Sequence, residues 1–121
     1  MKGLNPEQIA EKTKEYERVA NYVLIDPSGG RGDEFDIIHS VAVYQELQEK
    51  IPLMLIGFAG GFNGHNVRKR IQTLTEMTGA EDFCIEAEGG LRDKITDRYG
   101  DDILSLDKVK QYIYEVKRVL P

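Results

Sequence analysis

The sequence lacks an excess of basic side chains and lacks any long apolar run, and each absence excludes a class of protein. Its 16 lysine and arginine residues are outnumbered by 21 aspartate and glutamate residues, which gives a net charge of −5. Nucleic acids and membrane surfaces both require a basic face, so neither is expected as a partner. The longest uncharged stretch, residues 51–66, contains Pro52 and several glycines. It is shorter than the ~20 apolar residues that a membrane span needs.

Cysteine is almost absent as well, and the usual nucleotide-binding motifs are missing. The lone Cys84 cannot form an internal disulfide or a cysteine-based metal cluster, and His39 and His65 lack metal-ligand spacing. Residues 28–32 lack the Lys-Ser/Thr of a P-loop, and no G-x-G-x-x-G follows an expected strand. The first residues contain no signal-peptide core. We therefore expect no metal, no cofactor and, as the simplest compartment, a reducing cytoplasm.

What the sequence does contain is a weak repeat of three glycine pairs, each preceded by a short apolar run. The pairs are Gly29-Gly30, Gly60-Gly61 and Gly89-Gly90, spaced 31 and 29 residues apart. The apolar runs, which are typical of buried strands, cover residues 22–25, 53–56 and 83–85. A further short strand is predicted around residues 35–37.

Helical patterns separate these strands. They cover residues 5–18, which start at Asn5-Pro6, residues 43–51, residues 63–74 with Asn63 as the expected N-cap, and residues 105–120 with Ser105 as the expected N-cap. Strands that alternate with helices predict an α/β fold with a parallel sheet.

The glycine pairs predict an anion-binding site at the carboxyl ends of the strands. Ligands of parallel α/β proteins bind at that edge, where glycine allows the backbone to approach closely and a helix N-terminus favours phosphate. The turn from Gly60 to Asn63, which leads into a helix, is the best of the three. A single Gly-Gly pair could merely form a tight turn, whereas three pairs in register favour an anion site.

Asp26 follows the first expected strand and has two interpretations of about equal weight. It is a catalytic acid at the end of a barrel strand, or it accepts backbone hydrogen bonds in a turn formed with Pro27.

Glu86 near the end of the last strand is similarly open. It could act as an acid/base or bind a sugar hydroxyl, or it could pair with Arg31, Arg92 or Lys94. Phe83 and Ile85 are expected to pack under helices, which would turn Cys84 and Glu86 toward the other side of the sheet.

Several short motifs together resemble the second half of phosphoribosylanthranilate isomerase. They are Val23–Asp26, Ser28–Gly32, Phe35-Asp36, Gly60–Asn63 and Asn66-Val67. That family carries L-L-D, G-G-T-G, F-D-W and G-G-L-x-x-x-N-V in the same order with similar spacing. The resemblance covers roughly residues 19–120.

The resemblance implies that residues 1–121 form a single partial domain, half of a (βα)₈ TIM barrel. A full barrel has ~250 residues. Strands five to eight of the barrel, with flanking helices, would lie at residues 22–26, 34–37, 53–57 and 82–87. The implied activity is an Amadori-type isomerisation of a phosphorylated aminated ribose, a step of tryptophan biosynthesis.

The resemblance also implies the roles of individual residues. Asp26 falls on the family's general acid, and the glycines near the ligand and its phosphate are Gly29, Gly30, Gly32, Gly60, Gly61, Gly89 and Gly90. Glu86 is an auxiliary candidate because of its place at a strand end, not because of the resemblance. The family's general base is a cysteine on the first barrel strand, and Cys84 lies on a different strand.

Two departures from the family pattern lead to an alternative function. The family's S-S-G-V-E series is replaced here by residues 86–90, and the first four barrel strands have no counterpart in the chain. The expected partners are a phosphorylated small molecule and either a complementary N-terminal half-barrel or a second copy. The alternative is a half-barrel that binds a phosphorylated ligand or self-assembles without turnover.

Overall fold

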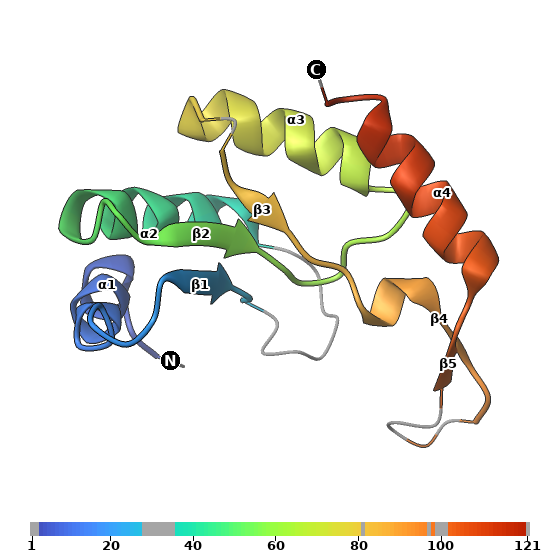
Figure 1. Cartoon of the computed structure of the whole chain (residues 1–121), viewed down its shortest axis with the longest axis horizontal. Helices are drawn as coiled ribbons and strands as arrows, with labels where there is room; N and C mark the ends of the chain where they lie inside the picture. The colour runs from blue at the N-terminus through green and yellow to red at the C-terminus, as the bar shows by residue number, and fades with distance from the viewer. Residues whose placement is uncertain (1–2, 28–35, 81, 97, 99–101, 121) are drawn as a thin grey trace.

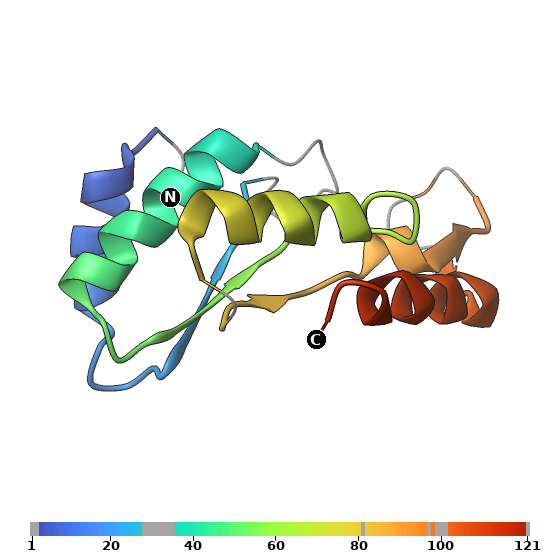
Figure 2. The same ribbon diagram turned by 90° about the horizontal axis from the view of Figure 1, so that it is seen from above.

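The computed structural model describes residues 3–27, 36–80, 82–96, 98 and 102–120. In chain order the elements are α1 (Pro6–Lys14), β1 (Tyr22–Ile25), α2 (Ile37–Lys50), β2 (Leu55–Phe58), α3 (Val67–Thr78), β3 (Cys84–Ile85), the 3₁₀ helix η1 (Gly89–Leu91), β4 (Arg92–Lys94), β5 (Asp102–Leu104) and α4 (Leu106–Lys117). Helices α1, α2 and α3 lie along one face of β1–β3, whereas α4, β4 and β5 lie beyond the carboxyl ends of these strands (Figures 1 and 2).

The first three strands form a parallel sheet in the order β1-β2-β3. Ile25 lies opposite Phe58, and Phe58 lies opposite Ile85. The predicted α/β class with a parallel sheet is therefore confirmed, and the arrangement is compatible with part of an α/β barrel.

The strand predicted at residues 34–37 is wrong where the structure describes it. Asp36 is the N-cap of α2, its carboxylate accepts a hydrogen bond from the His39 amide at 3.1 Å, and Ile37 is the first helical residue. Residues 34 and 35 lie outside the described residues. β1 also pairs directly with β2, so no strand separates them and their assignment to barrel strands five and seven is wrong. The cap signal of Asp36 outweighs the strand-like pattern around it.

The expected helix starts are confirmed at two of three positions. Asn5 forms a capping box with Gln8, and Ser105 accepts from the Lys108 amide at 3.3 Å. The third expectation is wrong, because the N-cap of α3 is Asn66 and not Asn63. The Asn63 side chain instead accepts hydrogen bonds from the His65 and Asn66 amides in the turn before the helix.

The core lies where α2, β2 and α3 meet. Its largest fully buried side chains are Tyr44, Phe58 and Phe62. The Phe58 ring stacks on Tyr44 of α2 at 5.6 Å between centroids and meets the edge of Phe83 at 5.3 Å. Phe83 therefore packs on the helix-covered side, as the sequence predicted.

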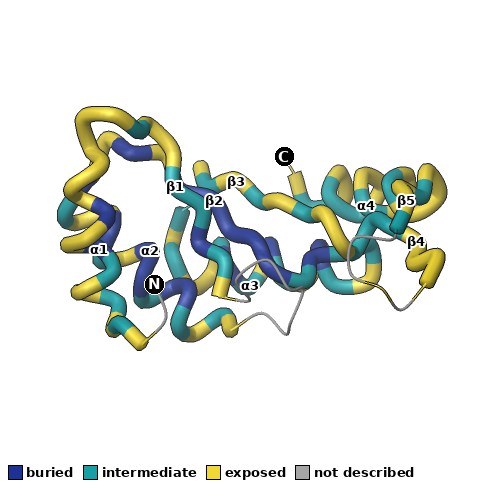
Figure 3. Tube along the Cα trace, turned by 90° about the horizontal axis from the view of Figure 1, so that it is seen from below, coloured by how far each residue is buried: buried dark blue, intermediate teal, exposed yellow. Residues whose placement is uncertain are grey.

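The carboxyl-terminal part of the chain is much less buried than the core. No residue of α4 is buried, and its Leu106 and Ile113 are 69% and 46% exposed. Figure 3 shows the contrast between this region and the buried centre of the sheet. The antiparallel pair β4–β5, which the sequence did not predict, adjoins α4 through Lys108, whose ammonium lies 2.9 Å from Asp93. Within the described residues, no helix is long and apolar enough to cross a membrane.

Tyr112 of α4 is a polar group in an apolar setting, and it generates a prediction. Its hydroxyl is buried without a hydrogen-bond partner among the described residues, and burial raises the pKa of Tyr112 to about 12. Since an unsatisfied buried hydroxyl destabilises the folded state, Tyr112→Phe should raise the free energy of unfolding by about 1 kcal/mol at pH 7.

The same substitution should change the pH dependence. In the unfolded chain Tyr112 ionises near pH 10, whereas in the folded protein it stays neutral until about pH 12. The free energy of unfolding should therefore fall as the pH rises from 10 toward 12, and this fall should be smaller in Tyr112→Phe. Urea unfolding at pH 7 and pH 11.5 checks both effects, with Tyr16→Phe, an exposed tyrosine, as the control. A lower stability of Tyr112→Phe at pH 7 would contradict the prediction.

Candidate functional site

The carboxyl ends of the three parallel strands bring the predicted acidic residues to one edge. The backbone ladder continues one residue past the strands, because Ala59 N–H donates to the Ile25 carbonyl and Glu86 N–H to the Phe58 carbonyl, both at 2.9 Å. Asp26, Ala59 and Glu86 therefore occupy the next row across the sheet. Asp26 is half-buried and Glu86 is exposed. The structure thus brings the two predicted residues to the same edge, with a small side chain between them.

This row points away from the helix-covered face. Ile25, Phe58 and Ile85 pack into the core, so strand alternation turns their successors to the other face. Burial raises the pKa of the Tyr22 hydroxyl, and the nearby Cys84 and Glu86 raise it further. The expectation that Cys84 and Glu86 lie on the side opposite Phe83 is therefore confirmed.

Gly57 contributes to this face, although the sequence analysis did not single it out. A Cβ atom at this position would overlap the Tyr22 hydroxyl and lie 3.1 Å from Leu24 Cδ1. The Tyr22 ring therefore crosses the β2 backbone where a side chain is missing. A glycine inside a strand is a signal of such a close approach, and it could have identified the position.

The second glycine pair forms a sharp turn between β2 and α3. Gly60 and Gly61 have φ angles of 113° and 66°, which other residues rarely adopt. The Gly60 carbonyl accepts from Arg70 Nη1, and the Gly61 carbonyl accepts from Asn66 Nδ2, each at 2.9 Å. Both carbonyls of the pair are thus bound by side chains of the α3 start.

The residues after the pair hold the turn in place. Phe62 is 1% exposed, and the Arg70 guanidinium lies 5.2 Å from the centre of its ring. Asn63 N–H donates to Asn66 Oδ1 at 3.0 Å, and Asn66 N–H donates back to Asn63 Oδ1 at 3.1 Å. The turn is therefore anchored both in the core and by its own side chains.

The third glycine pair lies against the second. A Cβ atom on Gly90 would overlap the Phe62 carbonyl oxygen and lie 2.9 Å from Asn63 Cβ, whereas Gly89 has open space. The structure therefore brings together the second and third predicted glycine pairs. The remaining predicted glycines, Gly29, Gly30 and Gly32, lie outside the described residues.

The charges at the start of α3 suit an anion. Neither α2 nor α3 carries an acidic residue in its first turn, and α3 begins with the cations Arg68, Lys69 and Arg70. Arg68 pairs with Glu115 of α4 at 3.6 Å. Cations near a helix N-terminus are repelled by the positive end of the helix dipole, and a bound anion would offset the charge of the cations and of the dipole.

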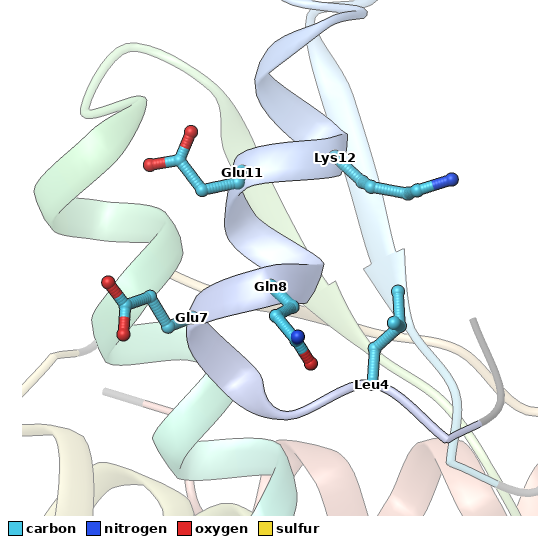
Figure 4. A pocket seen from close by; sticks show the side chains of 5 residues that line it. All are labelled: Leu4, Glu7, Gln8, Glu11 and Lys12. Carbon is cyan, nitrogen blue, oxygen red and sulfur yellow. The ribbon is translucent and has the colours of Figure 1, made fainter.

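A hollow elsewhere on the surface does not share this character. It lies on α1 and is lined by Leu4, Glu7, Gln8, Glu11 and Lys12 (Figure 4). Lys50 lies 2.8 Å from Glu11, and this contact lowers the pKa of that carboxyl. The hollow presents two carboxylates, so it does not extend the candidate site. In the described ranges, no three His, Cys, Asp or Glu residues gather to hold a metal ion.

Comparison with known proteins gives one relative to consider. An N-(5'-phosphoribosyl)anthranilate isomerase from Methanocella arvoryzae is 33% identical over 84 residues, which is 69% of this chain and 38% of that protein. The chain thus matches less than two-fifths of the relative's length. No protein-family model matches the chain, and no solved structure matches it. The similarity supports a relationship to this isomerase family.

The contact between the two glycine turns generates a prediction with a matched control. Gly90→Ala should lower the free energy of unfolding by about 1–3 kcal/mol, because the methyl group would push the Phe62 backbone out of place. Gly89→Ala should change it by less than about 0.5 kcal/mol, since its methyl group meets open space. Urea unfolding of both variants checks the difference. Equal effects would show that the two turns do not pack as described.

Proposed function

We propose that this chain supplies the general acid and the phosphate-binding turns of a phosphoribosylanthranilate isomerase-type reaction. The observation that carries the proposal is the shared edge of the sheet, where Asp26, the Gly60-Gly61 turn and Gly90 follow neighbouring strands. The 33% identity to an isomerase with this name supports the choice of reaction.

In this reaction Asp26 acts as the general acid on the sugar ring. Its carboxyl donates a proton to the ring oxygen while the bond from that oxygen to C1 breaks and the amine nitrogen forms a double bond to C1. A general base then removes the C2 proton, and the electron pair moves toward the nitrogen to give an enolamine. The C2 hydroxyl loses its proton, C1 gains one, and the product is a 1-amino-1-deoxyketose. Proton transfer of this kind contributes about 10²–10⁴-fold to a rate.

The phosphate of the substrate is assigned to the turn between β2 and α3. The start of α3 offers the N–H groups of its first turn, to which the N-cap Asn66 makes no side-chain hydrogen bond. Gly90 keeps the neighbouring turn close without a side chain in the way. Glu86, in the same row as Asp26, is assigned an auxiliary contact to a sugar hydroxyl.

The general base is assigned to a second half-barrel. The resemblance places it on a strand without a counterpart here, and the relative has more than half of its length outside the match. The occupant of this role is a complementary N-terminal half or a second copy, which would cover the open face of the sheet.

Replacement of Asp26 tests the acid role. Together with the second half-barrel, the chain should consume the fluorescent anthranilate adduct, and Asp26→Asn should lower turnover at least 100-fold. Asp82→Asn, which removes an exposed carboxylate just before β3, should leave turnover within about twofold. Turnover that persists in Asp26→Asn would contradict the role. Phosphate binding by a folded chain without any turnover would favour the non-catalytic alternative.

The uncovered apolar surface favours that alternative, a half-barrel that binds phosphate and assembles. Leu55 on the open face of β2 is 59% exposed, and Leu106 of α4 is 69% exposed. Two copies would cover such a face by twofold symmetry.

Light scattering tests the assembly. We expect a mass near 27.4 kDa, twice the 13.7 kDa of one chain. Leu55→Glu should reduce it to that of one chain, because it would place a charge in the interface. Ile38→Glu, at a 73% exposed position of α2 on the helix side of the sheet, should leave it unchanged. A wild-type mass of one chain would exclude self-assembly.

A further inference from the structure

Arg70 and Asn66 lie one helical turn apart at the start of α3 and reach back to the same glycine pair. Arg70 Nη1 donates to the Gly60 carbonyl and Asn66 Nδ2 to the Gly61 carbonyl, both at 2.9 Å. We define these two side chains as the α3 clamp. They bind two consecutive backbone carbonyls that lie before the helix, and helix formation requires neither of these hydrogen bonds.

The clamp decides which way the Gly61 amide points. All peptide bonds described are trans, and in a planar trans peptide the carbonyl of one residue and the N–H of the next point in opposite directions. With the Gly60 carbonyl held by Arg70, the Gly61 N–H points away from the guanidinium. Within the described residues this N–H donates no hydrogen bond to the protein.

A peptide between two glycines does not keep such an orientation by itself. Gly60 and Gly61 both have positive φ, and glycine populates positive and negative φ about equally, so rotation of the peptide between them meets little steric resistance. Its orientation therefore depends on outside partners.

Arg70 is suited to this task because it is itself held. Its guanidinium lies 5.2 Å from the centre of the Phe62 ring, and Phe62 is 1% exposed. A planar guanidinium can stack on the ring and still donate in a fixed direction, which an ammonium group cannot do.

We infer that Arg70 is a positioning residue for anion binding: it holds the Gly60–Gly61 peptide so that the Gly61 N–H is presented to a phosphate. The inference rests on the proposed function for its ligand. Arg70 acts through the backbone and does not touch the anion.

The experiment compares the wild-type chain with Arg70→Met, Arg70→Lys and the control Lys69→Met, which removes one positive charge from the neighbouring exposed position of α3. The first readout, without ligand, is the NMR order parameter of the Gly61 N–H together with thermal unfolding. The second is titration with inorganic phosphate, followed through the Gly61 amide shift. We expect Arg70→Met to lower the Gly61 order parameter and to weaken phosphate binding at least tenfold.

The controls separate positioning from charge and from folding. Lys69→Met should weaken binding by no more than about threefold and leave the Gly61 order parameter unchanged. Arg70→Lys keeps the charge and one donor, so it should recover part of the affinity and should fold if Arg70→Met does not. Equal losses in Arg70→Met and Lys69→Met, or an unchanged Gly61 order parameter in a folded Arg70 variant, would overturn the inference. If the Gly61 amide shift of the wild-type chain does not change with phosphate while the Gly61 order parameter depends on Arg70, the proposed phosphate site is wrong. Arg70 would then still orient the Gly60–Gly61 peptide, but not for anion binding.

Discussion

The candidate site depends on one constraint, which is the direct parallel pairing of β1, β2 and β3 in a single register. Phe58 is at its centre, with Ile25 on one side and Ile85 on the other. Their burial under the helices turns the following residues, including Asp26 and Glu86, to the open face. A slip of one residue in any strand would exchange its two faces and move its acidic residue into the core. The strand register that packs the core therefore also determines the geometry of the site.

The turn at Gly60 and Gly61 shows how a backbone segment with little conformational preference is held in one conformation. Gly60 and Gly61 allow a turn that other residues resist, but the same freedom leaves the backbone without a preferred orientation. The buried Phe62, the paired asparagines and Arg70 restrict this freedom. Gly90 completes the arrangement by the absence of a side chain, since any Cβ there would meet the Phe62 carbonyl.

The uneven burial gives the chain a second notable property. The side chains between α2, β2 and α3 are buried, whereas α4 has no buried residue and β2 exposes Leu55 on the open face. An amphipathic helix and a parallel sheet are normally covered on their apolar surfaces. The proposed second half-barrel would cover both surfaces.

The sequence alone determined the features that local chemistry controls. Apolar runs and their spacing predicted β1 and its parallel neighbours, and the caps at Asn5 and Ser105 predicted two helix starts, because these signals act over a few residues. The local pattern failed around Asp36, where a helix cap and a short strand compete for the same residues. Only the tertiary structure decided that β1 lies directly beside β2, that Tyr22 crosses Gly57, and that Arg70 holds the Gly60 carbonyl. Each of these joins residues whose contact depends on how separate elements pack, and no local periodicity carries that information.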